Sequence, residues 1–123
     1  MQQSALSVDY LMGRFDPKVD VRFVRVDAAW STHEMYMRKE AHRAFAEMHA
    51  AAKKEGIRLT IISATRTFEK QKSVWEQKWS GKRATVGATT NAKTSDVERA
   101  RANLRYSAMP GTSRHHWGTD IDI

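Results

Sequence analysis

The residues best suited to chemistry lie in the last eleven positions, 113–123, where two adjacent histidines, a glycine and two aspartates are close together. The end of this stretch alternates polar and apolar residues, so a strand there would carry Asp120 and Asp122 on one face. Gly118 allows a tight turn between an imidazole on a loop and a carboxylate on the strand. Zinc accepts both ligand types, so the spacing predicts a metal site built from His115 and Asp122. A hydrogen-bonded His–Asp pair without a metal is the alternative that spacing alone leaves open.

A second candidate is Arg66, which lies between a predicted strand at residues 57–63 and a predicted helix capped by Thr67. Such a junction places a side chain at the mouth of a cleft. A permanently charged guanidinium can stabilise the oxyanion that develops when water attacks a peptide carbonyl. A surface arginine held in a salt bridge is the alternative.

The elements that must position these residues suggest one small domain over residues 1–123. A β-rich segment at residues 21–26 predicts a short strand, and a capping-box pattern from Ser31 to Glu34 predicts a helix of five to six turns, closed by Gly56. Further predicted elements are a helix ending near residue 81, a loop at residues 82–94, a helix opening at Ser95 with a second capping box, and a turn at residues 110–111. This order indicates an α+β fold, with helices packed against a small antiparallel sheet.

Composition excludes several classes of protein. The chain has no cysteine, which excludes disulfides, thiolate ligands and a cysteine nucleophile. No run of 18 apolar residues exists, so no membrane span is expected, and the start lacks the pattern of a signal peptide. The formal net charge of +7 favours a polyanionic partner. Because Lys and Arg are scattered, we expect no specific nucleic-acid site, whereas an anionic cell-wall polymer would suit the charge.

The pattern Ser113-x-His115-x-x-Gly118-x-x-x-Asp122 resembles the zinc-binding signature of the D-alanyl-D-alanine carboxypeptidase and dipeptidase family, the VanY-like M15 peptidases. The resemblance implies that His115 and Asp122 bind Zn²⁺ and that Ser113 contacts the substrate. It also implies the fold shared by these peptidases and hedgehog proteins. One position differs, because Asp120 stands where the family commonly has a small residue.

A second segment, residues 63–71, resembles the strand-to-helix segment of the same family, which carries an arginine followed five residues later by a glutamine. The resemblance implies that Arg66 faces the scissile carbonyl and that Gln71 helps to hold the substrate. The two segments occur in the order found in the family, and together the likeness covers roughly residues 35–123.

The family also places a catalytic glutamate and a third zinc ligand, a histidine, after the aspartate. Neither has a match before residue 123, so we expect a truncated domain that lacks its C-terminal segment, holds zinc weakly and hydrolyses poorly or not at all. The remaining histidines, His33, His42 and His49, fall on the predicted first helix, where surface or core-edge positions suit them better than zinc binding. His116 is a possible substitute, although neighbouring loop residues rarely bind one ion.

The resemblance therefore implies a zinc-dependent peptidase that hydrolyses D-alanine-containing bonds of peptidoglycan stems in the cell envelope or periplasm. Three alternatives stay open: a non-catalytic peptidoglycan-binding module of the same fold, an endolysin-type endopeptidase, and a basic nucleic-acid-binding domain. The sequence does not separate carboxypeptidase, dipeptidase and endopeptidase activity.

Overall fold

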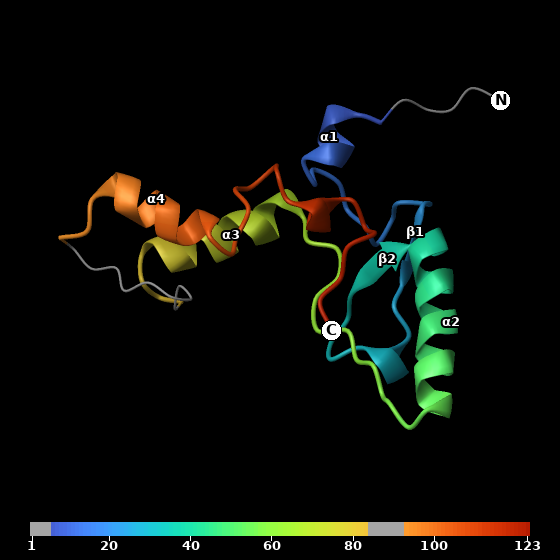
Figure 1. Cartoon of the computed structure of the whole chain (residues 1–123). Coiled ribbons are helices and arrows are strands. Elements are labelled where there is room, and N and C mark those ends of the chain that lie inside the picture. Colours follow the sequence, from blue (N-terminus) through green and yellow to red (C-terminus); the bar gives the residue numbers. More distant parts are fainter. Residues whose placement is uncertain (1–5, 84–92) are drawn as a thin grey trace.

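The structure, a computed structural model, describes residues 6–83 and 93–123. A sheet of two strands with one long helix makes up one side of the chain, and a pair of helices makes up the other (Figure 1). The C-terminal segment runs between these two parts. The helices and strands are α1 (Val8–Leu11), β1 (Phe23–Arg25), β2 (Tyr36–Arg38), α2 (Lys39–Lys54), α3 (Phe68–Trp79) and α4 (Asp96–Leu104), with short 3₁₀ helices η1 (Ala28–Trp30) and η2 (Arg114–His116).

The sheet is antiparallel, as predicted, and β1 confirms the strand expected within residues 21–26. Its register pairs Val24 with Met37 at the centre. Helix α2 packs against both strands and contributes Phe45 to the core. The buried core comprises Val26, Met35, Met37, Phe45, Ile61 and Ala64, with Trp30, Ala41, Leu59 and Ile121 packed against it.

The predicted start of the first long helix is wrong. Helix α2 begins at Lys39, after a residue that makes no side-chain capping bond. Residues 36–38 pair with β1 instead, and strand pairing takes precedence over the capping-box pattern. Glu34 accepts a hydrogen bond from the Tyr36 hydroxyl at 2.6 Å rather than closing a helix. The predicted end is confirmed, because Gly56 adopts a φ of +79° directly after the C-cap.

The strands predicted at residues 57–63 and at the C-terminus form no regular ladder with each other. A single antiparallel bridge joins Ser63 to Asp122, in which the Asp122 amide donates to the Ser63 carbonyl at 2.9 Å. Ile61 is fully buried and Ile121 packs against the core, whereas Ile57 and Ile123 are exposed. The bridge therefore fixes the segment before Arg66 beside the C-terminal carboxylates.

Helices α3 and α4 begin as predicted. The Thr67 side chain accepts from the Lys70 amide, and Ser95 and Glu98 form a complete capping box. The two helices pack side by side, and the Asn103 side-chain amide donates to the Trp75 carbonyl at 3.2 Å. The predicted loop at residues 82–94 falls mainly on residues 84–92, which lie outside the described part of the chain.

The N-terminal segment makes hydrogen bonds to the C-terminal motif, residues 113–122. The sequence did not predict this contact. The Tyr10 hydroxyl donates to the Trp117 carbonyl, and the Trp117 indole donates to the Leu11 carbonyl at 3.2 Å. The Phe68 amide, at the start of α3, donates to the Gly13 carbonyl at 2.8 Å. Residues 7–13 thus connect α3 to residues 117–118 and their neighbours in the motif, called the motif loop below.

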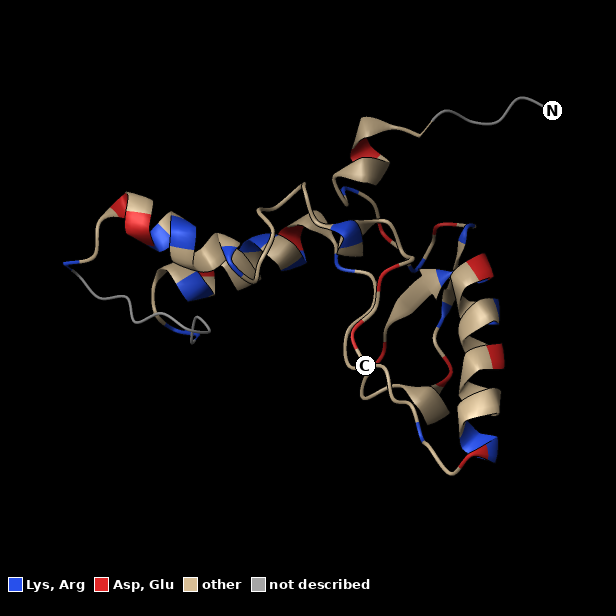
Figure 2. Cartoon of the chain, in the orientation of Figure 1, with Lys and Arg blue, Asp and Glu red and all other residues tan. Residues whose placement is uncertain are grey.

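Basic residues are spread over the helices and loops, and acidic residues lie among them (Figure 2). Within residues 6–83 and 93–123, no helix has the length and apolar character required to cross a membrane.

Candidate metal and substrate site

The His115 side chain is fixed by its backbone neighbours. Ser113 caps η2, and its hydroxyl oxygen accepts from the His115 amide at 3.1 Å. The imidazole Nδ1 lies 2.9 Å from the Ala64 carbonyl oxygen, which can only accept. Nδ1 therefore carries a hydrogen, so the tautomer that this bond favours has its lone pair on Nε2. This is the tautomer that a metal ligand requires.

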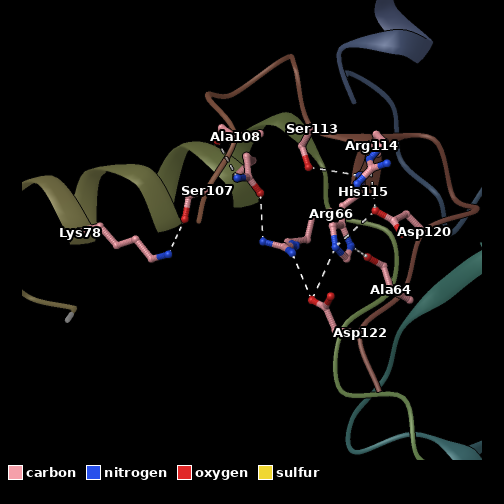
Figure 3. Close-up of polar contacts among 11 residues, drawn as sticks. Ala64, Arg66, Lys78, Ser107, Ala108, Ser113, Arg114, His115, Asp120 and Asp122 are labelled. Carbon is pink, nitrogen blue, oxygen red and sulfur yellow. Dashed lines mark hydrogen bonds and ion pairs between the residues drawn. The ribbon is translucent and has the colours of Figure 1, made fainter. Parts of the chain in front are cut away.

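The Nε2 atom of His115 faces two carboxylates. Asp122 Oδ2 lies 3.5 Å from His115 Nε2, and the two groups point toward each other (Figure 3). Asp120 Oδ2 is 3.9 Å from the same nitrogen and 3.8 Å from Arg114 Nε. The predicted pair is therefore brought together, with the second aspartate beside it.

The His115–Asp122 pair fits a zinc ion. Two ligand atoms about 2.0–2.1 Å from a tetrahedral zinc lie about 3.3 Å apart, close to the 3.5 Å between His115 Nε2 and Asp122 Oδ2. A neutral imidazole nitrogen and a carboxylate oxygen are also the donor types that zinc accepts. Within the described residues, no group of three His, Cys, Asp or Glu side chains is arranged to hold a metal ion.

Arg66 lies next to this pair, at the turn between the 57–65 segment and α3. Its Nη2 is 3.4 Å from Asp122 Oδ2 (Figure 3). Its Nη1 donates to Gln71 Oε1 at 3.1 Å. Burial lowers the pKa of the Arg66 guanidinium, while the negative charges of Asp122 and Asp120 act in the opposite direction. Since an arginine stays protonated in proteins, a positive charge is held beside the carboxylates.

Gln71 connects Arg66 to the wall of the cleft. Its side chain is 1% exposed, and its Nε2 donates to the Ala108 carbonyl at 2.8 Å. Both ends of the amide are therefore occupied, one by Arg66 and the other by the segment after α4. The geometry gives Gln71 a positioning role. The substrate contact that the resemblance implies for Gln71 stays a prediction.

His116 is held by the backbone at both ring nitrogens. Nδ1 donates to the Arg66 carbonyl at 2.6 Å, and Nε2 accepts from the Gly111 amide at 3.0 Å. Burial lowers the pKa of this fully buried imidazole, which keeps it neutral and preserves both bonds. In this arrangement His116 ties the turn at residues 110–111 to the segment that carries Arg66 and has no nitrogen left for a metal.

All five predicted site residues line one cleft of about 680 Å³: Arg66, Gln71, Ser113, His115 and Asp122. Because a serine hydroxyl can donate as well as accept, Ser113 retains a donor for a ligand there. The exposed apolar side chains of Leu104, Tyr106 and Met109 form another wall. The cleft therefore combines a metal-type donor pair, a fixed cation and an apolar surface.

Two supporting residues were missed from the sequence. Gly13 has a φ of +76°, and a Cβ there would lie 2.4 Å from His116 Nδ1, so the N-terminal segment packs directly on the motif. Tyr10 is buried and donates to the motif backbone. A glycine after a short helix was a local signal, but its partner lies about a hundred residues away in sequence. No local pattern reveals such a contact.

Comparison with known proteins identifies the family of the chain. The family model described as VanY, D-alanyl-D-alanine carboxypeptidase, matches residues 34–123. The chain therefore belongs to the VanY family of D-alanyl-D-alanine carboxypeptidases. It is 33% identical over 88 residues to the putative carboxypeptidase YodJ of Bacillus subtilis (strain 168), covering 72% of this chain and 26% of YodJ.

Two solved structures share the fold. One is the LdcB LD-carboxypeptidase, a protein that recognises peptidoglycan, with a TM-score of 0.58 and 30% identity over 80% of this chain and 41% of LdcB. The other is a mutant of the vancomycin-resistance D,D-pentapeptidase VanY in complex with Zn(II), with a TM-score of 0.59 and 23% identity over 80% of this chain and 55% of VanY. The predicted zinc-peptidase fold is thus confirmed. The chain spans about a quarter of YodJ and about half or less of each solved relative.

Proposed function

We propose that this chain forms the zinc- and substrate-binding face of a peptidase that hydrolyses D-alanine-containing peptide bonds of peptidoglycan stems. The observation that carries the proposal is the His115–Asp122 pair, 3.5 Å apart, with Arg66 fixed beside it in the same cleft. Membership of the VanY family and the zinc complex of a relative of the same fold support it.

His115 Nε2 and Asp122 Oδ2 would hold the ion. A bound zinc supplies a Lewis acid that polarises a carbonyl and acidifies water at neutral pH. The residues of the chain prepare this site before any ligand arrives. The Ala64 carbonyl holds the His115 tautomer, and the bridge to Ser63 holds the backbone of Asp122.

Arg66 would stabilise the negative charge that develops on the carbonyl oxygen of the scissile bond. Its guanidinium is fixed before reaction by Gln71 and Asp122, so little reorganisation is needed. The Ser113 hydroxyl would donate a hydrogen bond to the peptide. The apolar side chains of Tyr106 and Met109 would contact the alkyl groups of the peptide. Because the substrate is part of the cell wall, we place the protein in the cell envelope or periplasm.

The test measures release of free D-alanine by the zinc-loaded protein in the full length that its gene encodes. The substrate is a synthetic pentapeptide ending in D-Ala-D-Ala, and the same peptide ending in L-Ala-L-Ala is the substrate control. Arg66→Ala should lower kcat by about 10²–10³-fold with unchanged zinc content, as expected for loss of one oxyanion donor. Arg43→Ala, an exposed arginine on α2, is the matched control and should leave turnover unchanged.

Turnover of the Arg66→Ala variant within about threefold of wild type would remove Arg66 from the active site. Binding of the D-Ala-D-Ala peptide without any release of D-alanine would overturn the peptidase proposal and identify a non-catalytic peptidoglycan-binding module.

A further inference from the structure

A second cleft adjoins the candidate site. It has a volume of about 750 Å³ and shares Arg66 and Asp122 with the cleft that contains His115. The two clefts therefore meet at the Arg66–Asp122 ion pair. The second cleft lies between the start of α3 and the segment that leads into β2, residues 33–36.

The charges on the two sides of the second cleft differ. On the β2 side, Glu34 accepts from the Tyr36 hydroxyl and lies 3.7 Å from Lys18 and 3.9 Å from Arg25. These neighbours hold the pKa of Glu34 below its ordinary value, so the carboxylate is ionised and balanced by cations. This side of the cleft carries no large excess of either charge.

The α3 side carries two cations, Lys70 and Arg83, both exposed. Neither has an ion-pair partner among residues 6–83 and 93–123. Arg83 is held in place by Gln77, because its Nε donates to Gln77 Oε1 at 3.2 Å and its amide donates to the Gln77 carbonyl at 3.0 Å. The α3 side is thus a positive rim that no carboxylate among the described residues balances, and its Arg83 is held in place.

We propose that a peptide ligand lies across Arg66 in an extended form and reaches from the cleft that contains His115 into the second cleft. There, Lys70 and Arg83 bind a carboxylate of the peptide. This inference rests on the proposed function and adds a second recognition site to it. The ligand is a peptide of several residues with an acidic side chain remote from the scissile bond. A terminal dipeptide would occupy only the cleft that contains His115.

A single carboxylate fits the second cleft better than a dense polyanion does. The cleft is lined by four cationic side chains, Lys18, Arg66, Lys70 and Arg83, and by the carboxylates of Glu34 and Asp122. Lys18 and Arg66 are already paired with these carboxylates. Of the cationic side chains that the structure describes in this cleft, Lys70 and Arg83 remain for a ligand, and a polymer with many negative charges would be repelled by Glu34 and Asp122.

The experiment compares two N-acetylated pentapeptides that end in D-Ala-D-Ala and carry either D-glutamate or D-glutamine at their second position. It measures kcat/KM for release of D-alanine by the full-length zinc-loaded protein at low ionic strength. Wild type should prefer the glutamate peptide by about three- to tenfold, mainly through KM, because each exposed ion pair contributes up to about fivefold. The double variant Lys70→Gln/Arg83→Gln should show no preference.

The control is Lys39→Gln/Lys54→Gln, which removes the same charge from the exposed first and last residues of α2. This variant should keep the preference for the glutamate peptide. Acetyl-D-Ala-D-Ala, which is too short to reach the rim, should be cleaved equally by all variants and reports on folding. Equal use of both pentapeptides by wild type, or a preference that survives Lys70→Gln/Arg83→Gln, would overturn the inference alone. No release of D-alanine from any peptide would overturn the proposed function and the inference with it.

Discussion

Replacement of Gly118 by alanine tests how tightly the motif loop is packed on the sheet. Gly118 has a φ of +82°, where an alanine costs about 1–2 kcal/mol in backbone strain. A Cβ there would also lie 2.3 Å from Phe23 Cε1 and 2.9 Å from Arg38 Cγ. The side-chain and backbone shifts that such overpacking forces cost about 1–3 kcal/mol of stability. We therefore expect Gly118→Ala to lower the free energy of unfolding by about 2–5 kcal/mol.

Gly56 provides a matched control, because its φ of +79° is nearly the same but a Cβ there would meet nothing within 4 Å. Gly56→Ala should therefore cost only the backbone strain, about 1–2 kcal/mol. The assay is denaturant unfolding followed by far-UV circular dichroism, with the two midpoints compared at equal slope. Equal destabilisation by the two substitutions, within about 0.5 kcal/mol, would refute the packing of the motif loop against Phe23.

Three further predictions concern the residues around the site. His116→Gln should destabilise the fold by about 2–5 kcal/mol in denaturant unfolding, because the Gly111 amide and the Arg66 carbonyl lose buried partners; a cost no larger than that of the exposed His33→Gln would contradict this role. Gln71→Leu should lower kcat of the full-length protein without loss of zinc, whereas Gln71→Glu keeps the acceptor for Arg66 and should recover part of the activity; equal activity of the two variants would argue against positioning of Arg66. A side-chain hydrogen bond from Arg22 holds the pKa of Asp20 below its ordinary value of 3.8, so the stability from this pair is present above that pH and is lost as the pH falls through the lowered pKa. Asp20→Asn should flatten the acid limb of a stability–pH curve, and an unchanged limb would exclude the pair as a contributor.

The local signals in the sequence predicted much of the helical structure. Thr67 and Ser95 cap their helices through the expected side-chain bonds, and Gly56 ends α2 with a positive φ. Each of these features depends on residues within one turn of the helix, so a short window contains the information. The closeness of His115 and Asp122 was likewise predictable, because both residues lie in one short motif.

Long-range contacts account for what the sequence did not predict. The pattern from Ser31 to Glu34 satisfied a capping box, but pairing of residues 36–38 with β1 took that segment out of the helix. The predicted strand at residues 57–63 kept its buried Ile61 yet made only isolated bridges, because its partners are single residues of other segments. Likewise, the bracing of Trp117 by Tyr10 joins residues more than a hundred positions apart.

The position of the Arg66 guanidinium shows most clearly what local sequence patterns do not predict. The sequence predicted Arg66 at the mouth of a cleft but not the bridge between Ser63 and Asp122 that brings it to the His115–Asp122 pair. The second cleft, with Lys70 and Arg83, likewise depends on the approach of residues 33–36 to α3. Neither arrangement is visible in local spacing.

Zinc content is the most direct measure of the central claim, that His115 and Asp122 bind one metal ion. The full-length protein, loaded with zinc and dialysed, should retain one ion per molecule by elemental analysis, and His115→Ala and Asp122→Asn should each lose most of it. His33→Ala, which removes an exposed histidine outside the cleft that contains His115, should retain zinc at the wild-type level. Full retention of zinc by both His115→Ala and Asp122→Asn would contradict the proposed metal site.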